Sequence, residues 1–557
     1  MSASSVTLPQ PTPAQLARGI AGGVPADLSQ SPLLGILGVI VGAGVVTLTS
    51  RMISLGLPDF RGHLGFGYDE SAWIGTAFDV GLMFIGPFTV YLGGLIQPRR
   101  ILLASAALFT LLSTLIPFLH SYPIVIVGVG LAGLSSGTFY PLTLTFALRN
   151  IPVRYLPYTI ALYASFVDGA VNIAPSLYGW YRNHLSWHWM FWNSAAITAV
   201  MMLCIYFGIP KSSPAKEHDE APSFAGFLYA SAGLALILAA CEQGERLDWW
   251  RSGLFTAIFA SGSFLLLCSF TRRLRAPNPL VDMPYLKNWN TILLAIGLFF
   301  FRFFLVTTII LIPQSLAIHG FEADQIGPAV IWTAVSFAPL SLVAGYLLLE
   351  NVDPRLLLTA GFASMAFASL MSAEMTSAWA APNYFGTEFL TGFGQCFAFI
   401  GLVAALILQG LFSGGLLKPR KILTFAAFIH TVRIFGGTIG GILMGRFIAE
   451  REKLHSNLLG LHVQSGNWIT DDAIRQMTAR ALARSSGLTQ AAGRAVEIMG
   501  ERIRLQAYTL SLNDGFYLVA CGCAVALLFV AVLRQSPLKF GDLSTIQRLL
   551  ISQKESK

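Results

Sequence analysis

Fourteen apolar runs, each long enough to cross a lipid bilayer, limit what this chain can fold into. A helix needs about 20 mostly apolar residues to span the hydrocarbon core, where each backbone polar group must find its partner inside the helix. We therefore predict an all-α polytopic membrane protein. The predicted spans cover residues 33–56, 71–95, 100–119, 122–146, 155–179, 189–209, 223–242, 252–271, 289–313, 324–349, 356–376, 384–409, 421–447 and 513–534.

The small share of charged residues supports this prediction. Only 11% of the 557 residues are charged and 54% are hydrophobic, whereas soluble domains carry roughly 25% charged residues. A soluble fold of this length has too little interior to hide so much apolar surface. The six cysteines lie in or beside apolar runs without the spacing of a disulfide framework or a metal site, so we expect no cofactor. The net charge of +8 reflects loop topology and does not indicate a nucleic-acid partner.

Basic residues in the short loops indicate how the chain is oriented. Most of them follow the even-numbered spans, for example Arg99, Arg100 and Lys211, and few lie in the opposite loops. Cytoplasmic loops carry the excess of Lys and Arg, so both termini are predicted to be cytoplasmic. Residues 1–31 are expected to form a disordered cytoplasmic tail, and residues 536–557 a second tail on the same side.

Two segments are too polar to span the membrane. Residues 448–512 lie between the last two spans, on the predicted outer side, and combine many arginines with apolar residues at helical spacing. This pattern predicts a short amphipathic helical cap. Residues 210–222 on the cytoplasmic side are rich in Pro, Ser and charge, which is typical of a flexible linker.

A short sequence repeats between the two halves of the chain. Gln-Pro-Arg-Arg at 97–100 follows the second span, and Asp-Pro-Arg at 353–355 follows the tenth. Secondary transporters are often built from such repeats, although Pro-Arg is also simply a good start for a cytoplasmic helix. A repeat of six spans predicts an N-terminal bundle, a linker with two inserted spans, and a C-terminal bundle that includes the outer loop. The corresponding ranges are 32–210, 211–287 and 288–535.

Charged residues inside the spans are candidates for function. Asp168 lies near the middle of the run 155–179, with no opposite charge near it on the same run. A carboxylate at that depth costs about 2.5–3.5 kcal/mol or more on insertion, so such residues are usually functional. Asp79, Arg302 and Arg433 also lie inside apolar runs. This pattern suggests a protein that moves protons or charged groups across a membrane.

Four motifs resemble those of one family. They are Ser-Ala-Trp-Ile-Gly-Thr-Ala-Phe at 71–78, Leu-Ser-Trp-His-Trp-Met-Phe-Trp-Asn at 185–193, Ala-Pro-Asn-Pro-Leu-Val-Asp at 276–282 and Arg-Ile-Phe-Gly-Gly-Thr-Ile-Gly at 433–440. Together they resemble the major facilitator superfamily, and within it the fourteen-span drug:proton antiporters of the EmrB/QacA type. The resemblance implies two six-helix bundles, two inserted central spans and transport by alternating access.

The chain also departs from the family pattern. The cytoplasmic motif after the second span is shortened to Gly94, Arg99 and Arg100 without its aspartate, and the antiporter motif of the fifth span keeps only Pro175 and Gly179. We expect these five residues to serve conformational change.

In the first span, Thr49 stands where the family usually has an aspartate, and Arg51 follows two residues later. The resemblance therefore implies that the proton site has moved.

The family fold places each charged residue either on the wall of the central cavity or at the interface between the two bundles. Arg51, Arg302 and Glu388 would lie on cavity spans, whereas Asp79, Asp168 and Arg433 would lie on the spans between the two bundles. Asp168, Asp79 and Glu388 are the candidates for proton coupling. Arg302, Arg51, Arg433 and His430 are the candidates for charge partners or for the substrate cavity.

Each candidate also has a structural interpretation. Asp79 and Arg433 can form an ion pair between the bundles, Arg51 can extend to the interface, and Glu388 can lie among lipid headgroups. His430 can titrate near neutral pH or bond to a backbone carbonyl. Pro175 can serve only to kink its helix.

These observations favour a proton-coupled antiporter that exports amphipathic or aromatic molecules across a bacterial inner membrane. The arginines favour anionic or neutral substrates. Family relatives of this kind often work with a periplasmic adaptor and an outer-membrane channel, and the 448–512 cap faces the side on which an adaptor would bind. The alternative is an importer or facilitator of one small metabolite. An enzyme is not expected, because the nine histidines are scattered and lie mostly in loops.

Overall fold

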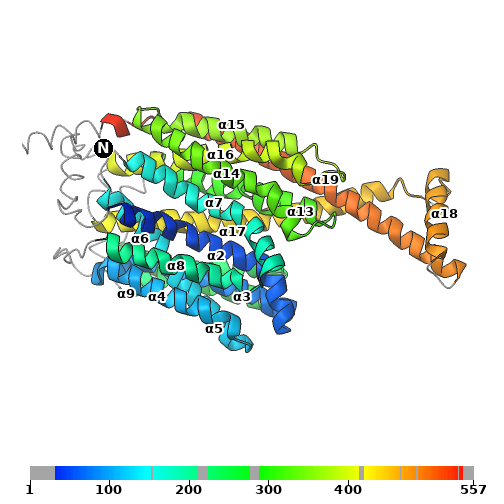
Figure 1. The fold of residues 1–557 in the computed structure, drawn as a ribbon, viewed down its shortest axis with the longest axis horizontal. Helices are drawn as coiled ribbons and strands as arrows, with labels where there is room; N and C mark the ends of the chain where they lie inside the picture. The colour runs from blue at the N-terminus through cyan, green and yellow to red at the C-terminus, as the bar shows by residue number, and fades with distance from the viewer. Residues whose placement is uncertain are drawn as a thin grey trace, which may run out of the picture.

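The computed structural model describes residues 32–151, 155–209, 224–275, 288–412, 419–464, 466–483, 487–536 and 538–542. Fourteen of its helical segments are long and apolar enough to cross a membrane, which confirms the predicted number and makes the chain a multi-pass membrane protein. The predicted tail 1–31, the linker 210–222, the motif 276–282 and most of the second tail lie outside the described residues. Both described ends of the chain lie at the same end of the molecule (Figure 1), which we call the termini side.

The first bundle consists of six spans built around α2. Gly137 and Thr138 divide the fourth span into two helices, and the third span ends in a 3-10 turn, η1. α2 packs against α6, α7 and α8, and α3 packs against α5. The elements are α2 (Pro32–Leu64), α3 (Tyr68–Leu95), α4 (Pro98–Leu115), η1 (Ile116–Phe118), α5 (Tyr122–Ser136), α6 (Phe139–Asn150), α7 (Leu156–His184) and α8 (Trp189–Gly208).

The second bundle has six spans in a similar arrangement. Its first span is interrupted by a π-helical turn, η3, a feature found often at functional sites. α16 packs against α14 and α15, and α19 packs against α15 and α17. The elements are α12 (Trp289–Phe304), η3 (Thr307–Leu311), α13 (Ile312–Ala317), α14 (Ala323–Leu349), α15 (Pro354–Ser372), α16 (Ala381–Phe412), α17 (Pro419–Gly460) and α19 (Leu488–Val532).

Two inserted spans, α9 (Phe224–Gln243) and α10 (Gly253–Arg275), join the bundles in sequence. They pack against each other at Gly233 and Gly262, where an added Cβ would lie 2.9–3.0 Å from the carbonyl oxygen of the facing glycine. α9 also packs against α3 and touches α17. The inserted pair therefore lies beside the seam between the two bundles.

The segment 448–512 is longer than the predicted cap. α17 continues beyond its apolar run to Gly460, and α19 begins at Leu488, well before the predicted span at 513–534. With α18 (Trp468–Leu482) across their ends, these extensions form a helical hairpin that projects from the bundles (Figure 1). The short-cap prediction was wrong because the polar extensions contain no proline to end the helices. We call this end of the molecule the hairpin side.

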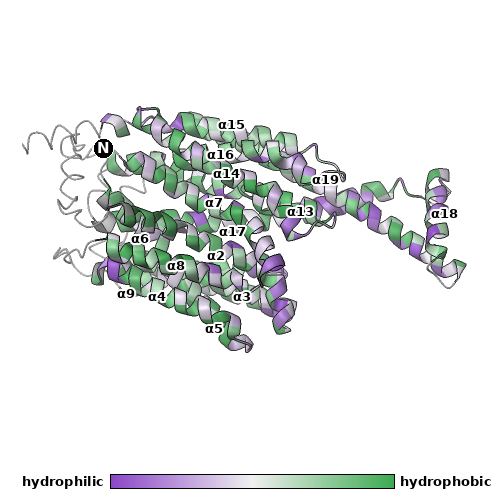
Figure 2. Cartoon of the chain, viewed as in Figure 1, coloured by the Kyte–Doolittle hydropathy of each residue, from purple (hydrophilic) through white to green (hydrophobic). Residues whose placement is uncertain are grey.

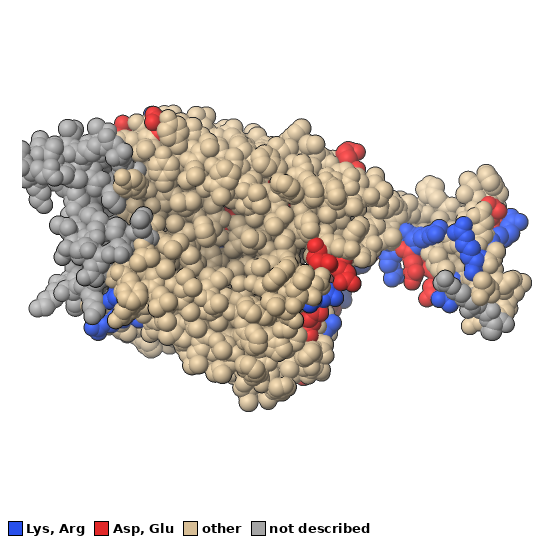
Figure 3. Space-filling model, viewed as in Figure 1, with Lys and Arg blue, Asp and Glu red and all other residues tan. Residues whose placement is uncertain are grey.

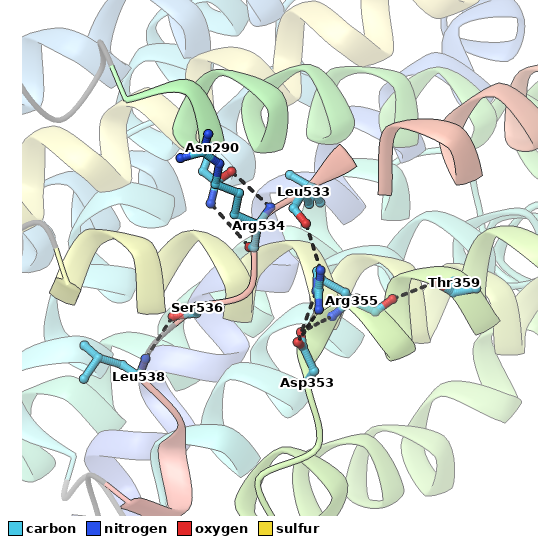
Figure 4. Close-up of polar contacts among 8 residues, drawn as sticks. All are labelled: Asn290, Asp353, Arg355, Thr359, Leu533, Arg534, Ser536 and Leu538. Atoms are coloured by element: carbon cyan, nitrogen blue, oxygen red, sulfur yellow. Dashed lines mark hydrogen bonds and ion pairs between the residues drawn. The ribbon is translucent and has the colours of Figure 1, made fainter. Parts of the chain in front are cut away.

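The repeated Pro-Arg sequence has the same structural role in both bundles. Arg99 donates from Nη2 to the carbonyl oxygen of Tyr206, at the end of α8, over 2.7 Å. Arg355 donates from Nη1 to the carbonyl oxygen of Leu533, at the end of α19, over 2.8 Å (Figure 4). Each arginine thus joins the start of the third span of its bundle to the end of the sixth.

The surface fits a molecule that spans a bilayer. Helices of the body are mainly hydrophobic, whereas the hairpin carries many hydrophilic residues (Figure 2). On the face drawn in Figure 3, almost all Lys, Arg, Asp and Glu side chains lie near the ends of the body or on the hairpin. On this face the middle of the body is almost free of charged side chains. The ionisable residues of the candidate site lie inside the body, around a cavity.

Candidate functional site: a cavity between the two bundles

A cavity of about 450 Å³ lies between the bundles. Residues of α2, α3 and α7 line it from the first bundle, residues of α12, η3 and α17 line it from the second, and α9 adds a wall from the inserted pair. Five ionisable side chains face it among the described residues: Arg51, Asp79, Glu242, Arg302 and Arg433. The sequence predicted four of these five.

The cavity is closed toward the termini side. There α3 and α17 are in direct contact: an added Cβ at Gly86 would lie 2.7 Å from Cδ2 of His430, and Gly93 lies against Leu423. Nearer the hairpin side, the cavity is lined instead by residues of α3 between 72 and 82 and by residues of α17 between 433 and 438. The free volume therefore lies toward the middle and the hairpin side.

Asp168 and Arg302 form an ion pair beside this cavity. Nη1 of Arg302 on α12 lies 2.9 Å from Oδ1 of Asp168 on α7, so the pair joins the two bundles. Asp168 is 1% exposed and Arg302 is 9% exposed. Oδ2 of Asp168 and Nε of Arg302 have no hydrogen-bond partner. The neutralising charge that the run 155–179 lacks comes from the other bundle.

Arg433 is 3% exposed. Among the described residues, its contacts with the first bundle involve no carboxylate. Its Nη1 donates to Oγ1 of Thr47 over 3.0 Å, and its guanidinium lies 4.3 Å from the ring centre of Tyr140. His430, one turn earlier, stacks on the same ring at 5.3 Å. The predicted Asp79–Arg433 ion pair was wrong for the described residues, because Arg433 contacts Thr47 and Tyr140 while Asp79 accepts a hydrogen bond from Ser50.

Arg51 reaches the second bundle. Its Nη2 donates to the carbonyl oxygen of Ile309 over 2.9 Å, and its Nε has no partner. Ile309 belongs to η3, and both residues line the cavity. The side chain therefore does not extend to the membrane surface, which rules out one interpretation of this residue.

Thr49, at the usual position of the family aspartate, faces away from the cavity. It is 1% exposed, and its Oγ1 lies 2.8 Å from Oγ of Ser194 on α8.

Asp79 faces a carboxyl group that sequence reasoning missed. Oγ of Ser50 donates to Oδ1 of Asp79 over 3.2 Å. Glu242, at the end of α9, lines the same cavity, and its carboxyl group lies within hydrogen-bonding reach of Asp79. The available signal was an acidic residue at the end of an apolar run. It was missed because Glu242 is the last residue of the predicted span 223–242 and not inside it.

Glu388 is fully buried between α14 and α16 and does not line the cavity. Oγ1 of Thr333 donates to its Oε2 over 2.6 Å, and its Oε1 has no partner. A position among lipid headgroups is therefore wrong. Two turns later on α16, Gln395 accepts a hydrogen bond from Nδ2 of Asn172 over 3.1 Å, and Asn172 lies one turn after Asp168.

The predicted conformational residues lie at helix contacts. Pro175 is buried inside the unbroken helix α7. An added Cβ at Gly179 would lie 2.7 Å from the backbone of Asp324, so this glycine allows the close approach of α7 and α14. Gly94 lies in the last turn of α3, Arg99 binds the end of α8, and Arg100 is exposed.

Polar contacts join the bundles at the hairpin side of α7 and α14. Arg182 lies 3.8 Å from Asp59 of the first bundle and 3.5 Å from Glu322 of the second. Nδ2 of Asn183 donates to Asp324 over 2.9 Å. These exposed ion pairs contribute little each, about 0–1 kcal/mol, so they can break when the bundles move apart.

Comparisons with known proteins show the family and the fold. The model of the Major Facilitator Superfamily matches residues 39–441. The probable multidrug resistance protein EmrY of Escherichia coli (strain K12) is 24% identical over 489 residues, which cover 85% of this chain and 90% of that protein. The fatty acid resistance protein FarB of Neisseria gonorrhoeae is 21% identical over 475 residues, which cover 84% of this chain and 89% of that protein.

Among solved structures, the proton:xylose symporter XylE bound to 6-bromo-6-deoxy-D-glucose aligns with a TM-score of 0.53 and 12% identity. The alignment covers 97% of this chain and 100% of that chain. At this identity the likeness shows the fold alone.

Proposed function

Since the chain belongs to the major facilitator superfamily, and is therefore a secondary transporter and not an enzyme, we propose that it is a proton-coupled antiporter. In this proposal it exports amphipathic or aromatic small molecules across a bacterial inner membrane by alternating access. Proton flow into the cell drives the export. The cavity between the bundles is the substrate site, and it opens alternately to either side.

The Asp168–Arg302 ion pair is the observation that carries this proposal. It is buried and links α7 of one bundle to α12 of the other. A proton on Asp168 removes the negative charge, and a neutral carboxyl group holds a guanidinium less strongly than a carboxylate does. Protonation therefore changes the strength of a contact between the two bundles. A transporter needs such a link between proton binding and bundle movement.

The cavity wall can bind the polar end of an amphipathic molecule. Arg51, Arg302 and Arg433 each present an Nε without a partner, and these groups suit substrate oxygen atoms that accept hydrogen bonds. A hydrogen-bond donor group of the substrate can bind at the same wall to Asp79, provided that Asp79 is in its carboxylate form. Because a proton binds the same carboxylate, proton and substrate compete there. Such competition is the requirement for antiport.

Glu388 extends the proton path in this proposal. Glu388, Thr391 and Gln395 lie on one face of α16 at helical spacing, and Gln395 binds Asn172 next to Asp168. Polar side chains therefore lead from Asp168 toward Glu388, nearer the hairpin side. We propose that this row carries protons to Asp168.

The test is the sign of proton movement in proteoliposomes that contain a pH-sensitive dye. The substrate is a compound chosen from a drug-susceptibility panel of a deletion strain. Antiport predicts that the substrate evokes proton release from vesicles with an acidic interior. Downhill uptake of the substrate without proton release would exclude antiport.

A second candidate, cotransport of an anion with a proton, is favoured by the three arginines. An anion that takes Arg302 from Asp168 leaves a buried carboxylate without its partner, and that carboxylate then gains a proton. Anion and proton would move together, as an importer of an anionic metabolite requires. In the same assay, the substrate would then carry protons with it, and the dye signal would have the opposite sign.

The hairpin supports a further part of the proposal, a periplasmic adaptor partner. Apolar side chains on it are strongly exposed, among them Leu461, Trp468, Ile469 and Leu488. Exposed apolar groups of this kind typically mark interaction sites. Replacing these four residues by serine is expected to abolish resistance in cells while transport in proteoliposomes continues. Unchanged resistance would exclude this partner surface.

A further inference from the structure

The inserted helix α9 is fixed at the seam between the bundles. Nε2 of Gln243, the last residue of α9, donates to Oγ1 of Thr76 over 2.7 Å and to the carbonyl oxygen of Ala72 over 3.2 Å. Thr76 and Ala72 lie on α3 and line the cavity. The end of α9 therefore enters the wall of the substrate site and does not lie only against lipid.

The turn after α9 is tied to both bundles. Arg246 lies 2.8 Å from Asp69, before the cavity portion of α3, and donates to Oε1 of Gln243 over 2.6 Å. Glu245 lies 3.1 Å from Arg446 on α17. The Arg246 contacts fix the end of α9, whereas the Glu245–Arg446 pair is exposed and contributes little, about 0–1 kcal/mol.

This placement brings two carboxyl groups together. Glu242 of α9 and Asp79 of α3 lie within hydrogen-bonding reach, at the wall of the cavity. Two carboxylates repel each other and have no hydrogen to donate, whereas one shared proton makes a hydrogen bond between them. The geometry thus fits one proton held between two acids.

The remaining charged groups at the cavity do not neutralise this pair. Arg51 of α2 binds the Ile309 carbonyl, Arg302 of α12 binds Asp168, and Arg433 of α17 binds Thr47 and Tyr140. Among the described residues, neither Asp79 nor Glu242 has an ion-pair partner. Asp79 instead receives a hydroxyl hydrogen bond from Ser50.

An independent observation marks the same cavity as a binding site. Arg302 and Arg433 are at least nine-tenths buried, line the cavity, and have an unpartnered Nε. An unsatisfied buried donor is costly and calls for a partner that arrives with a ligand. The acid pair therefore lies on the wall of a site prepared for a polar molecule.

We propose that Asp79 and Glu242 form a second proton-binding site, built with a residue of the inserted helix pair. The proposal rests on the proton-coupled function given above and assigns the inserted spans a part in it. The site holds one proton when the substrate is absent. A substrate donor group displaces that proton, and the pair then carries the second negative charge. Asp168 remains the link between the bundles.

Glu245 provides a matched control, because it lies one turn beyond Glu242 but on the surface. A hydrogen bond from Trp249 holds the pKa of Glu245 below its usual range, so this carboxyl group is charged at neutral pH. Glu245→Gln therefore removes a carboxylate from the same turn without removing a shared proton.

Infrared titration of the reconstituted full-length protein tests the site with the proton itself as the probe. The wild-type protein is expected to show a protonated-carboxyl band at neutral pH that disappears at alkaline pH. Measured in a Glu388→Gln background, so that this other buried carboxyl group adds no band, Glu242→Gln and Asp79→Asn should each remove the band, and Glu242→Asp should retain it. Glu245→Gln and Asp168→Asn should leave it in place.

The full band in Glu242→Gln would overturn the proposal, as would its loss in Glu245→Gln. The outcome is independent of transport, because no substrate is added. If the band behaves as expected while the wild-type protein moves no protons with substrate, the proton site stands and the proposed antiport fails. If protons move with substrate but the band is absent, antiport stands and the second site fails.

Discussion

Nη1 of Arg302 lies 2.9 Å from Oδ1 of Asp168, and this ion pair connects the two six-span bundles beside the cavity. Each residue alone is a costly charge in an apolar environment. Together they give the protein a contact between bundles whose strength depends on one proton. The proposed coupling of proton binding to bundle movement depends on this relationship.

The pair predicts a strongly non-additive mutant cycle. Arg302→Gln leaves Asp168 buried without a counter-charge and should reduce stability by about 3–5 kcal/mol. Asp168→Asn in the same chain should recover at least half of that loss, because the uncompensated charge is gone. Unfolding of the purified protein in detergent measures all four variants. Additive losses would contradict a direct pair.

Asp79 and Arg433 should behave differently. Both line the cavity, but Arg433 contacts Thr47 and Tyr140, and Asp79 contacts Ser50. The effects of Asp79→Asn and Arg433→Gln on stability should therefore add within about 0.5 kcal/mol. If the double variant were more stable than Arg433→Gln alone, the result would support the Asp79–Arg433 ion pair that the sequence suggested.

Gly179→Ala should separate α7 from α14 at the hairpin side. Its Cβ would lie 2.7 Å from backbone atoms of Asp324, which cannot move aside without shifting the helix. We expect transport to fall at least tenfold, with greater labelling of a cysteine placed at Asn183. Gly169→Ala on the same helix is the control, because its Cβ meets only a Phe337 ring carbon at 3.6 Å. Equal effects of the two substitutions would contradict this account.

The equivalent arginines of the two bundles should contribute equally to stability. Arg99→Ala and Arg355→Ala each remove a hydrogen bond to the last turn of a sixth span and should cost about 1 kcal/mol. Arg100→Ala, beside Arg99 but exposed, should cost much less. Thermal unfolding of the three variants tests this order, and a large effect at Arg100 alone would reverse it.

The sequence was sufficient to predict the spans, because hydropathy and helix length reflect the bilayer directly. The fourteen spans, the all-helical fold and the resemblance to EmrB-type exporters are confirmed. Polar segments were harder to predict. No hydropathy signal distinguishes a short cap from α17 and α19 continuing as a hairpin, since an exposed helix has no apolar run to measure.

The sequence predicted most of the charged residues of the candidate site, but it did not predict which of them contact each other. A charged side chain inside an apolar run is energetically costly and therefore indicates a functional residue. This argument identifies Asp79, Asp168, Arg302 and Arg433. Which of them meet depends on helix rotation and on packing between distant spans, and one sequence contains neither. Glu242 escaped for the same reason, because α9 places it against α3 only in the folded molecule.

Proton movement by Asp168→Asn proteoliposomes is the most direct test of the central claim. The account predicts that the wild-type protein releases protons from acidic vesicles when substrate is added, whereas Asp168→Asn, inserted in equal amounts, sustains no release beyond the one proton per molecule that substrate displaces from the Asp79–Glu242 site. Any downhill substrate transport by the variant is expected to occur without a sustained proton signal. Proton release at the wild-type rate by Asp168→Asn would contradict the assignment of Asp168 as the coupling residue.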